Sequence, residues 1–173
     1  MPGTVYHVPP IPPDPAHTVY VEAGPLRIGI EHRVLDDADL EANYQGEAMA
    51  EIEAAVAGQD ISDNGVSLHV FGAADGHEYL RFDMFEREPH YHYIRNDAGA
   101  YQTILEFDRV AHGEMLPWAL EQLRTRLVEM LRFAGAESLI EALDARALEA
   151  SLPEVERLAV AAEAELAAAR RRA

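Results

Sequence analysis

The stretch VSLHVFGAADGHEYLRFDMFER, residues 66–87, carries the clearest β-sheet pattern in this chain of 173 residues. Apolar and polar side chains alternate on both sides of a turn at residues 73–76, which is typical of strands that bury one face. The turn contains Asp75 and Gly76, and both residue types favour a tight connection between antiparallel strands. We therefore predict a β-hairpin with a core-facing row of Val66, Leu68, Val70, Leu80, Phe82 and Met84.

The opposite face of this hairpin carries polar residues. If the strands pair around the turn, His69 lies beside Arg81 and Asp83 lies beside Ser67. In one hypothesis, Asp83 orients a histidine that acts as a general base while Arg81 holds an anionic substrate. In the other, the same residues form a cross-strand ion pair on an exposed sheet face, which is a common and weakly stabilising arrangement.

Four further strands are expected around the hairpin, at residues 17–21, 26–34, 90–94 and 101–107. Within residues 26–34 the alternation places His32 in the apolar row and Glu31 and Arg33 on the opposite face. Asp36 then starts a single inserted helix as its N-cap. The buried stripe of that helix is Leu40, Tyr44, Ala48, Ile52 and Val56.

The pattern after Glu114 is helical. We expect one helix to residue 134, a second at residues 138–149 and a third that starts at a capping box of Ser151 and Glu154. The predicted fold class is α+β: an antiparallel β-sheet at residues 17–107 with one inserted helix, followed by a C-terminal three-helix layer at residues 114–172. Residues 17–173 are expected to form one domain.

The N-terminal segment, residues 1–16, holds six of the ten prolines. Proline fixes φ and removes an amide donor, so this segment is expected to be an extended Pro-rich arm outside the sheet. Such an arm lies either on its own domain or on a neighbouring subunit.

Composition excludes several classes of function. The chain has no cysteine, and its 14 basic residues are all arginine, so thiol and lysine chemistry are absent. A formal net charge of -17 argues against nucleic acid and anionic membranes as partners. No apolar run reaches the length of a membrane span and the N-terminus does not resemble a signal peptide, so we expect a cytoplasmic protein.

The acidic residues are concentrated between Glu31 and Asp63, a segment with ten acidic residues and one arginine. A solvated helix face explains this segment most simply. A docking surface for a basic protein partner is the alternative.

The sharpest candidate site is the His90-x-His92 pair. Residues two apart on a strand point to the same side, so the two imidazoles would lie together, as in many β-sheet metal sites. A divalent transition metal (zinc, iron, manganese or nickel) would suit them. The third ligand would come from Asp83, Glu86, His69 or His32. Alternatively, the interleaved tyrosines form a contact surface.

No recognised catalytic motif is present, which favours an accessory or interaction protein, a small subunit of a larger or homo-oligomeric assembly. The first alternative is a small metal-dependent enzyme or metal-binding domain centred on His90 and His92. The second is a metal-free small-molecule pocket that uses His69, Arg81 and Asp83 as catalytic candidates. The sequence leaves open whether the chain is an enzyme.

Overall fold

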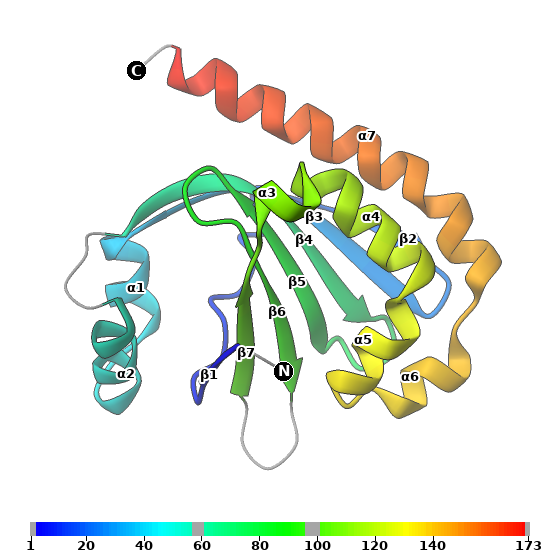
Figure 1. Cartoon of the computed structure of the whole chain (residues 1–173), viewed down its shortest axis with the longest axis horizontal. Helices are drawn as coiled ribbons and strands as arrows, with labels where there is room; N and C mark the ends of the chain where they lie inside the picture. Colours follow the sequence, from blue (N-terminus) through cyan, green and yellow to red (C-terminus); the bar gives the residue numbers. More distant parts are fainter. Residues whose placement is uncertain (1–2, 57–60, 96–100, 172–173) are drawn as a thin grey trace.

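The fold is built around a seven-stranded antiparallel sheet in a computed structural model that describes residues 3–56, 61–95 and 101–171 (Figure 1). The strand order is β1-β7-β6-β5-β4-β3-β2. The predicted α+β class, with sheet first and helical layer last, is confirmed. The strands are β1 Thr4–Tyr6, β2 Thr18–Ala23, β3 Leu26–Asp36, β4 Ser62–Gly72, β5 Glu78–Phe85, β6 His90–Arg95 and β7 Tyr101–Glu106.

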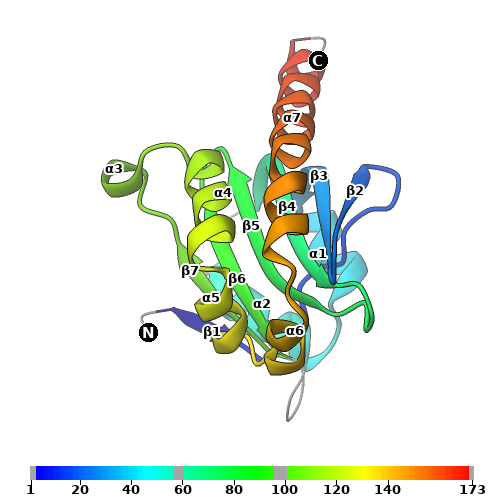
Figure 2. The same cartoon turned by 90° about the vertical axis from the view of Figure 1, so that its right-hand side faces the viewer.

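Helices cover both faces of the sheet. The C-terminal helices lie on one face, where α7 packs across β2, β3 and β4, while α1 and α2 lie behind the sheet in the second view (Figure 2). The helices are α1 Asp37–Asn43, α2 Glu47–Val56, α3 Arg109–His112, α4 Met115–Thr125, α5 Leu127–Phe133, α6 Glu137–Ala142 and α7 Ala145–Arg170. None of the helices described is both long and apolar enough to cross a lipid bilayer.

The expected single inserted helix is divided into α1 and α2. Asp36 caps α1 as predicted, and its side chain accepts from the backbone N–H of Asp39. The chain leaves helical geometry at Tyr44, and Gly46 adopts φ 58°, a left-handed conformation that glycine reaches without the steric cost of a side chain. Leu40 and Tyr44 still pack together, in a small second core with Val8 of the arm.

The C-terminal boundaries also differ from the prediction. The helix expected to run to residue 134 is divided at Arg126 into α4 and α5. The predicted start of a helix at Ser151 was wrong, because α7 begins at Ala145 and runs through Pro153. Asp144 caps α7 by accepting from the N–H groups of Arg146 and Ala147, so helical geometry is established before the proline.

The expectation that the N-terminal arm lies outside the sheet was wrong for residues 4–6. These residues contain no proline, and they pair antiparallel with β7, Thr4 lying opposite Ile104. Residues 7–14 then cross the polar face of the sheet and are bound by their own chain. The Tyr44 hydroxyl donates to the Pro9 carbonyl at 2.8 Å, and the Asp14 N–H donates to Glu31 at 2.8 Å. Residues 1–2 and 172–173 are outside the described part.

The main core lies between the sheet and α4–α7. The predicted apolar row of the hairpin faces this core, and Leu68, Leu80 and Phe82 are fully buried. A β-bulge between Val70 and Phe71 shifts the register at the end of β4, so that Phe71 lies opposite Glu78. Side chains alternate along β4 and β5, so the polar row of the hairpin lies on the face of the sheet that points away from this core.

Candidate metal centre

Strand pairing gathers polar residues from five strands, β3 to β7, on the face away from α4–α7. Ser67 lies opposite Asp83, Asp83 lies opposite His90, and His69 lies opposite Arg81. The sequence predicted the first and third of these pairs, but not that of Asp83 with His90. The expectation of an exposed face was wrong, because the arm, α1 and α2 cover it. Its buried polar residues are Glu31, Arg33, Ser67, His69, Glu78, Arg81, Asp83, His92 and Gln102.

A cavity of about 650 Å³ lies between this face and its cover. This volume is in the range of small-molecule sites. Its lining combines apolar side chains with a few charged groups, among which are Arg33, Arg81 and Asp83. His90 and His92 line the same cavity.

Asp83, His90 and His92 converge within it. Asp83 Oδ2 lies 2.8 Å from His92 Nε2 and 3.3 Å from His90 Nε2. One ligand atom from each residue lies within 4.8 Å of the other two. Neighbouring ligands in a tetrahedral zinc site with bonds of about 2.1 Å are separated by about 3.4 Å, so the group needs only small shifts to hold an ion.

Hydrogen bonds on the far side of each ring fix the tautomers of the two histidines. His90 Nδ1 lies 2.7 Å from the Glu88 carbonyl, which can only accept, so Nδ1 carries the proton. Gln102 donates its amide N–H to the Val8 carbonyl at 3.1 Å, so its oxygen accepts from His92 Nδ1 at 2.7 Å. In their neutral forms both histidines therefore turn an Nε2 lone pair toward the Asp83 carboxylate.

The charge states of the three residues agree with this arrangement. Burial alone would raise the pKa of Asp83, but hydrogen bonds from His90 and His92 hold that pKa well below its usual range. Burial alone would lower the pKa of His90, but the hydrogen bond to Asp83 raises it. Burial, together with the nearby charges of His90 and Arg81, lowers the pKa of His92 against the opposing effect of Asp83. These directions favour the charged form at His90 and the neutral form at His92.

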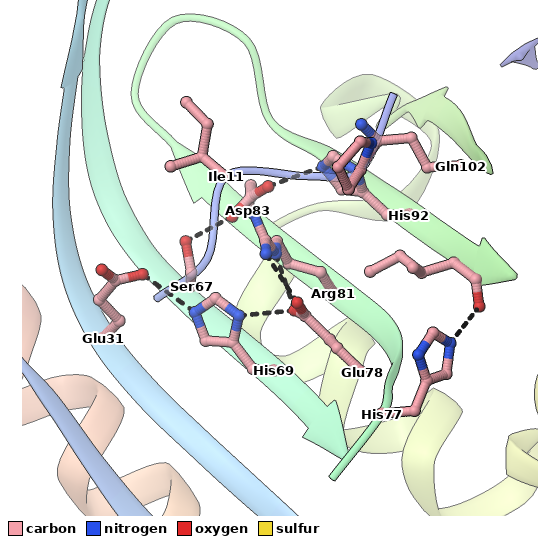
Figure 3. A network of polar contacts seen from close by, with 12 residues as sticks. Ile11, Glu31, Ser67, His69, His77, Glu78, Arg81, Asp83, His92 and Gln102 are labelled. Carbon is pink, nitrogen blue, oxygen red and sulfur yellow. Dashed lines mark hydrogen bonds and ion pairs between the residues drawn. The ribbon is translucent and has the colours of Figure 1, made fainter. Parts of the chain in front are cut away.

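A second polar group, which we call the ion-pair chain, runs from β3 to β5 beside this site (Figure 3). Arg33 donates to Glu31 at 3.2 Å, and Glu31 lies 3.0 Å from His69 Nε2. His69 Nδ1 lies 2.7 Å from Glu78. Arg81 completes the chain with two hydrogen bonds to Glu78, from Nε at 2.8 Å and from Nη2 at 2.7 Å.

The surroundings of His69 and Glu78 favour their charged forms. Burial alone would lower the pKa of His69, but hydrogen bonds to Glu31 and Glu78 raise it, which favours the imidazolium form. Burial alone would raise the pKa of Glu78, but the charge and hydrogen bonds of Arg81 lower it to about 2. With both ring nitrogens of His69 donating to carboxylates, no lone pair remains on this ring to accept a substrate proton.

Residues 20–159 match the family described as Domain of unknown function (DUF7700). The chain belongs to the DUF7700 family. No curated protein matches it, and no solved structure matches it. In this member of the DUF7700 family, the site must therefore be interpreted from its own geometry.

The fold places the four candidates for a third ligand differently. Asp83 joins the histidine pair. His69 is held between two carboxylates, and Glu86 is exposed outside the group. His32 lies on the opposite face of the sheet, where its ring stacks near His17 with 4.3 Å between centroids and lies 3.7 Å from Glu165 of α7.

Sequence reasoning did not assign a role to Glu31, Arg33, Glu78 or Gln102. The alternation along β3 had already placed Glu31 and Arg33 together on the face opposite the apolar row. A carboxylate and a guanidinium on the same side of one strand could have indicated an ion pair there. Glu78 gave no signal, because the bulge that turns it inward is not visible in the sequence. The role of Gln102 as the partner of His92 depends on the pairing of β6 with β7, in which Gln102 lies opposite Ile94.

Proposed function

We propose that this chain is a metal-dependent enzyme that holds one divalent transition metal through Asp83, His90 and His92. One observation carries the proposal: three acceptor atoms converge on one point of a cavity wall, and both histidines are fixed by hydrogen bonds at Nδ1. Metal-binding histidines usually donate their other ring N–H to a carbonyl or carboxylate, which fixes ring and tautomer. A metal ion could take the place of the protons that join these histidines to Asp83.

The donor set favours zinc or iron(II). Two histidines and one carboxylate are a recurrent ligand set for catalytic zinc and for non-haem iron, both of which keep an open coordination position. The group lines a cavity of about 650 Å³, which gives that open position room for a small molecule. A bound ion of this kind would supply Lewis acidity, by which it could activate a water molecule or polarise an oxygen of a substrate.

The first test is the metal content of protein purified without chelator. We expect about one zinc or iron per chain by elemental mass spectrometry, and loss of that metal in His90→Ala and His92→Ala. His112→Ala is the matched control, because His112 is exposed on α3 and outside the group. A fourth variant, Gln102→Leu, removes the acceptor of His92 Nδ1 and should weaken binding by about 10- to 100-fold.

Two results would contradict the proposal. The first is a native chain that binds neither zinc nor iron(II) in a calorimetric titration of the chelator-treated protein. The second is metal content that stays unchanged in the variants of His90 and His92 while far-ultraviolet circular dichroism shows them folded.

The accessory-subunit hypothesis and the metal-free pocket both stay predictions. The accessory-subunit hypothesis rested in part on an arm that could lie on a neighbouring subunit. That argument is weaker, because the arm is bound by its own chain through Tyr44, Glu31 and Arg33. For the second, both nitrogens of His69 are already engaged, whereas Arg81 keeps free donors.

A further inference from the structure

Arg81 presents an unused hydrogen-bonding edge to the cavity. A guanidinium has five N–H donors, and the two bonds to Glu78 use only the edge formed by Nε and Nη2. Nη1 and the second N–H of Nη2 have no acceptor among the described residues. Arg81 is only 2% exposed, but in the described part of the chain no fully buried side-chain nitrogen lacks a hydrogen-bond partner. Because Nη1 has no partner, it is not fully buried. It is accessible from the cavity that Arg81 lines.

The ion-pair chain holds this edge in place. Glu78 is itself fixed by His69, and His69 is fixed by Glu31, so the guanidinium plane of Arg81 has little freedom. A donor pair whose orientation is fixed in advance loses less entropy when a ligand binds. Figure 3 shows the guanidinium between the carboxylates of Glu78 and Asp83.

The local charges leave room for an anion at Arg81. The ion-pair chain contains two arginines (Arg33 and Arg81) and two carboxylates (Glu31 and Glu78), and with His69 protonated between the carboxylates it carries one net positive charge. A buried charge without a partner is costly. Asp83 is a further carboxylate close by, but it accepts hydrogen bonds from Ser67 and His92, lies 3.3 Å from His90, and has no hydrogen bond with Arg81 among the described contacts.

We infer that the cavity binds a small carboxylate-bearing molecule, which Arg81 receives on its Nη1–Nη2 edge beside the metal position. The planar pair of N–H groups matches a carboxylate in two-point geometry. A single net positive charge suits a monoanionic group better than a phosphate of nearly two charges. The apolar part of the lining, which includes Ile11, Leu40 and Ile104, fits an aliphatic body on the ligand.

The position of Arg81 on β5 sets the reach of the ligand. Arg81 and Asp83 are two residues apart on the strand, about 7 Å at the rise of an antiparallel strand, and both side chains point to the same face. A ligand held at Arg81 can therefore bring a second oxygen, a few bonds from its carboxylate, to the ion. This part of the inference rests on the proposed function, whereas the carboxylate subsite itself does not.

The test is calorimetric titration of the full chain with acetate, 3-hydroxybutyrate, 4-hydroxybutyrate and inorganic phosphate, in zinc-loaded and in chelator-treated protein. We expect the monocarboxylates to bind more tightly than phosphate in both forms, and the hydroxybutyrates to bind more tightly still with zinc. Arg81→Lys keeps the charge but loses the fork, so the affinity should fall at least tenfold while metal content is unchanged. Arg87→Lys is the matched control, since Arg87 lines the same cavity and donates to the Ser62 carbonyl.

The outcomes separate the two proposals. Carboxylate binding that depends on Arg81 in a chain without metal affinity would support the subsite and overturn the metal centre. Absence of binding by every carboxylate, equal affinity in Arg81→Lys, or tighter binding of phosphate would overturn the subsite. If Arg81→Lys does not fold, the double variant Glu78→Gln with Arg81→Gln removes both charges of the pair, and it should lose carboxylate binding in the same way.

Discussion

Replacement of Glu78 by glutamine tests the buried ion-pair chain directly. The change keeps the size of the side chain but leaves the charges of Arg81 and His69 without the carboxylate that they share. Removing one partner of a buried ion pair typically costs about 3–5 kcal/mol. The depressed pKa of Glu78, about 2 against an ordinary value of 4.5, gives about 3 kcal/mol when each unit is worth about 1.4 kcal/mol. The two estimates agree, and the loss is a large part of the stability of a typical domain.

The assay is urea unfolding at neutral pH. With an m-value of about 2 kcal/mol/M, the midpoint of Glu78→Gln should fall by about 1.5–2.5 M while the slope stays the same. Glu154→Gln is the matched control. Glu154 also pairs with an arginine three residues ahead, Arg157, through two hydrogen bonds of 2.7 and 2.6 Å. Its side chain is 49% exposed against 9% for Glu78, so its midpoint should hardly move.

The pH dependence gives an independent check with a defined sign. Because the pKa of Glu78 is lowered in the folded state, its contribution to the free energy of unfolding is present above about pH 4.5 and is lost as the pH falls toward about 2. The difference between native protein and Glu78→Gln should therefore shrink on acidification. A midpoint no lower than that of the control, or a difference that does not change between pH 6 and pH 3, would refute the reasoning.

Three further substitutions probe other parts of the fold by thermal unfolding. Gly46→Ala meets no atom within 4 Å, so the strain of a left-handed residue acts alone and should cost about 1–2 kcal/mol; an unchanged melting temperature would contradict the described break between α1 and α2. Tyr44→Phe removes the hydrogen bond to the Pro9 carbonyl and should cost about 1 kcal/mol, with faster amide exchange in the arm; unaltered exchange would mean that this bond does not hold the arm. Phe82→Ala empties a fully buried position and should cost about 3–5 kcal/mol, and a loss below 1 kcal/mol would contradict the described core.

Local periodicity predicted the parts of the fold that depend on neighbouring residues. The alternation within residues 66–87 gave the hairpin, its core row and the pairing of His69 with Arg81, because side-chain direction in a strand has a period of two. It also placed His90 and His92 on one side of β6, where their ring centroids are 4.9 Å apart. These features need no knowledge of the remainder of the chain.

The features that the sequence did not predict depend on distant contacts. The polar face looked exposed because polar strand residues usually meet water, whereas here the arm and two helices cover it. His32 was a ligand candidate until the sheet placed it on the face packed against α7. Glu78 turns inward only because Tyr79 is an extra, unpaired residue of β5 at the bulge opposite Val70 and Phe71. Each of these outcomes is a matter of tertiary packing, which short-range patterns do not encode.

The pairing of β1 with β7 has a consequence for the order in which the molecule assembles. Every strand from β2 to β7 pairs with its neighbours in sequence, whereas Thr4 must find Ile104. Closing a loop of about 100 residues costs about 4 kcal/mol of chain entropy by the usual logarithmic scaling, and three paired residues return little of it. The meander from β2 to β7 therefore forms first and already contains Asp83, His90, His92 and Arg81. By the same scaling, the arm is expected to join the edge of the sheet last.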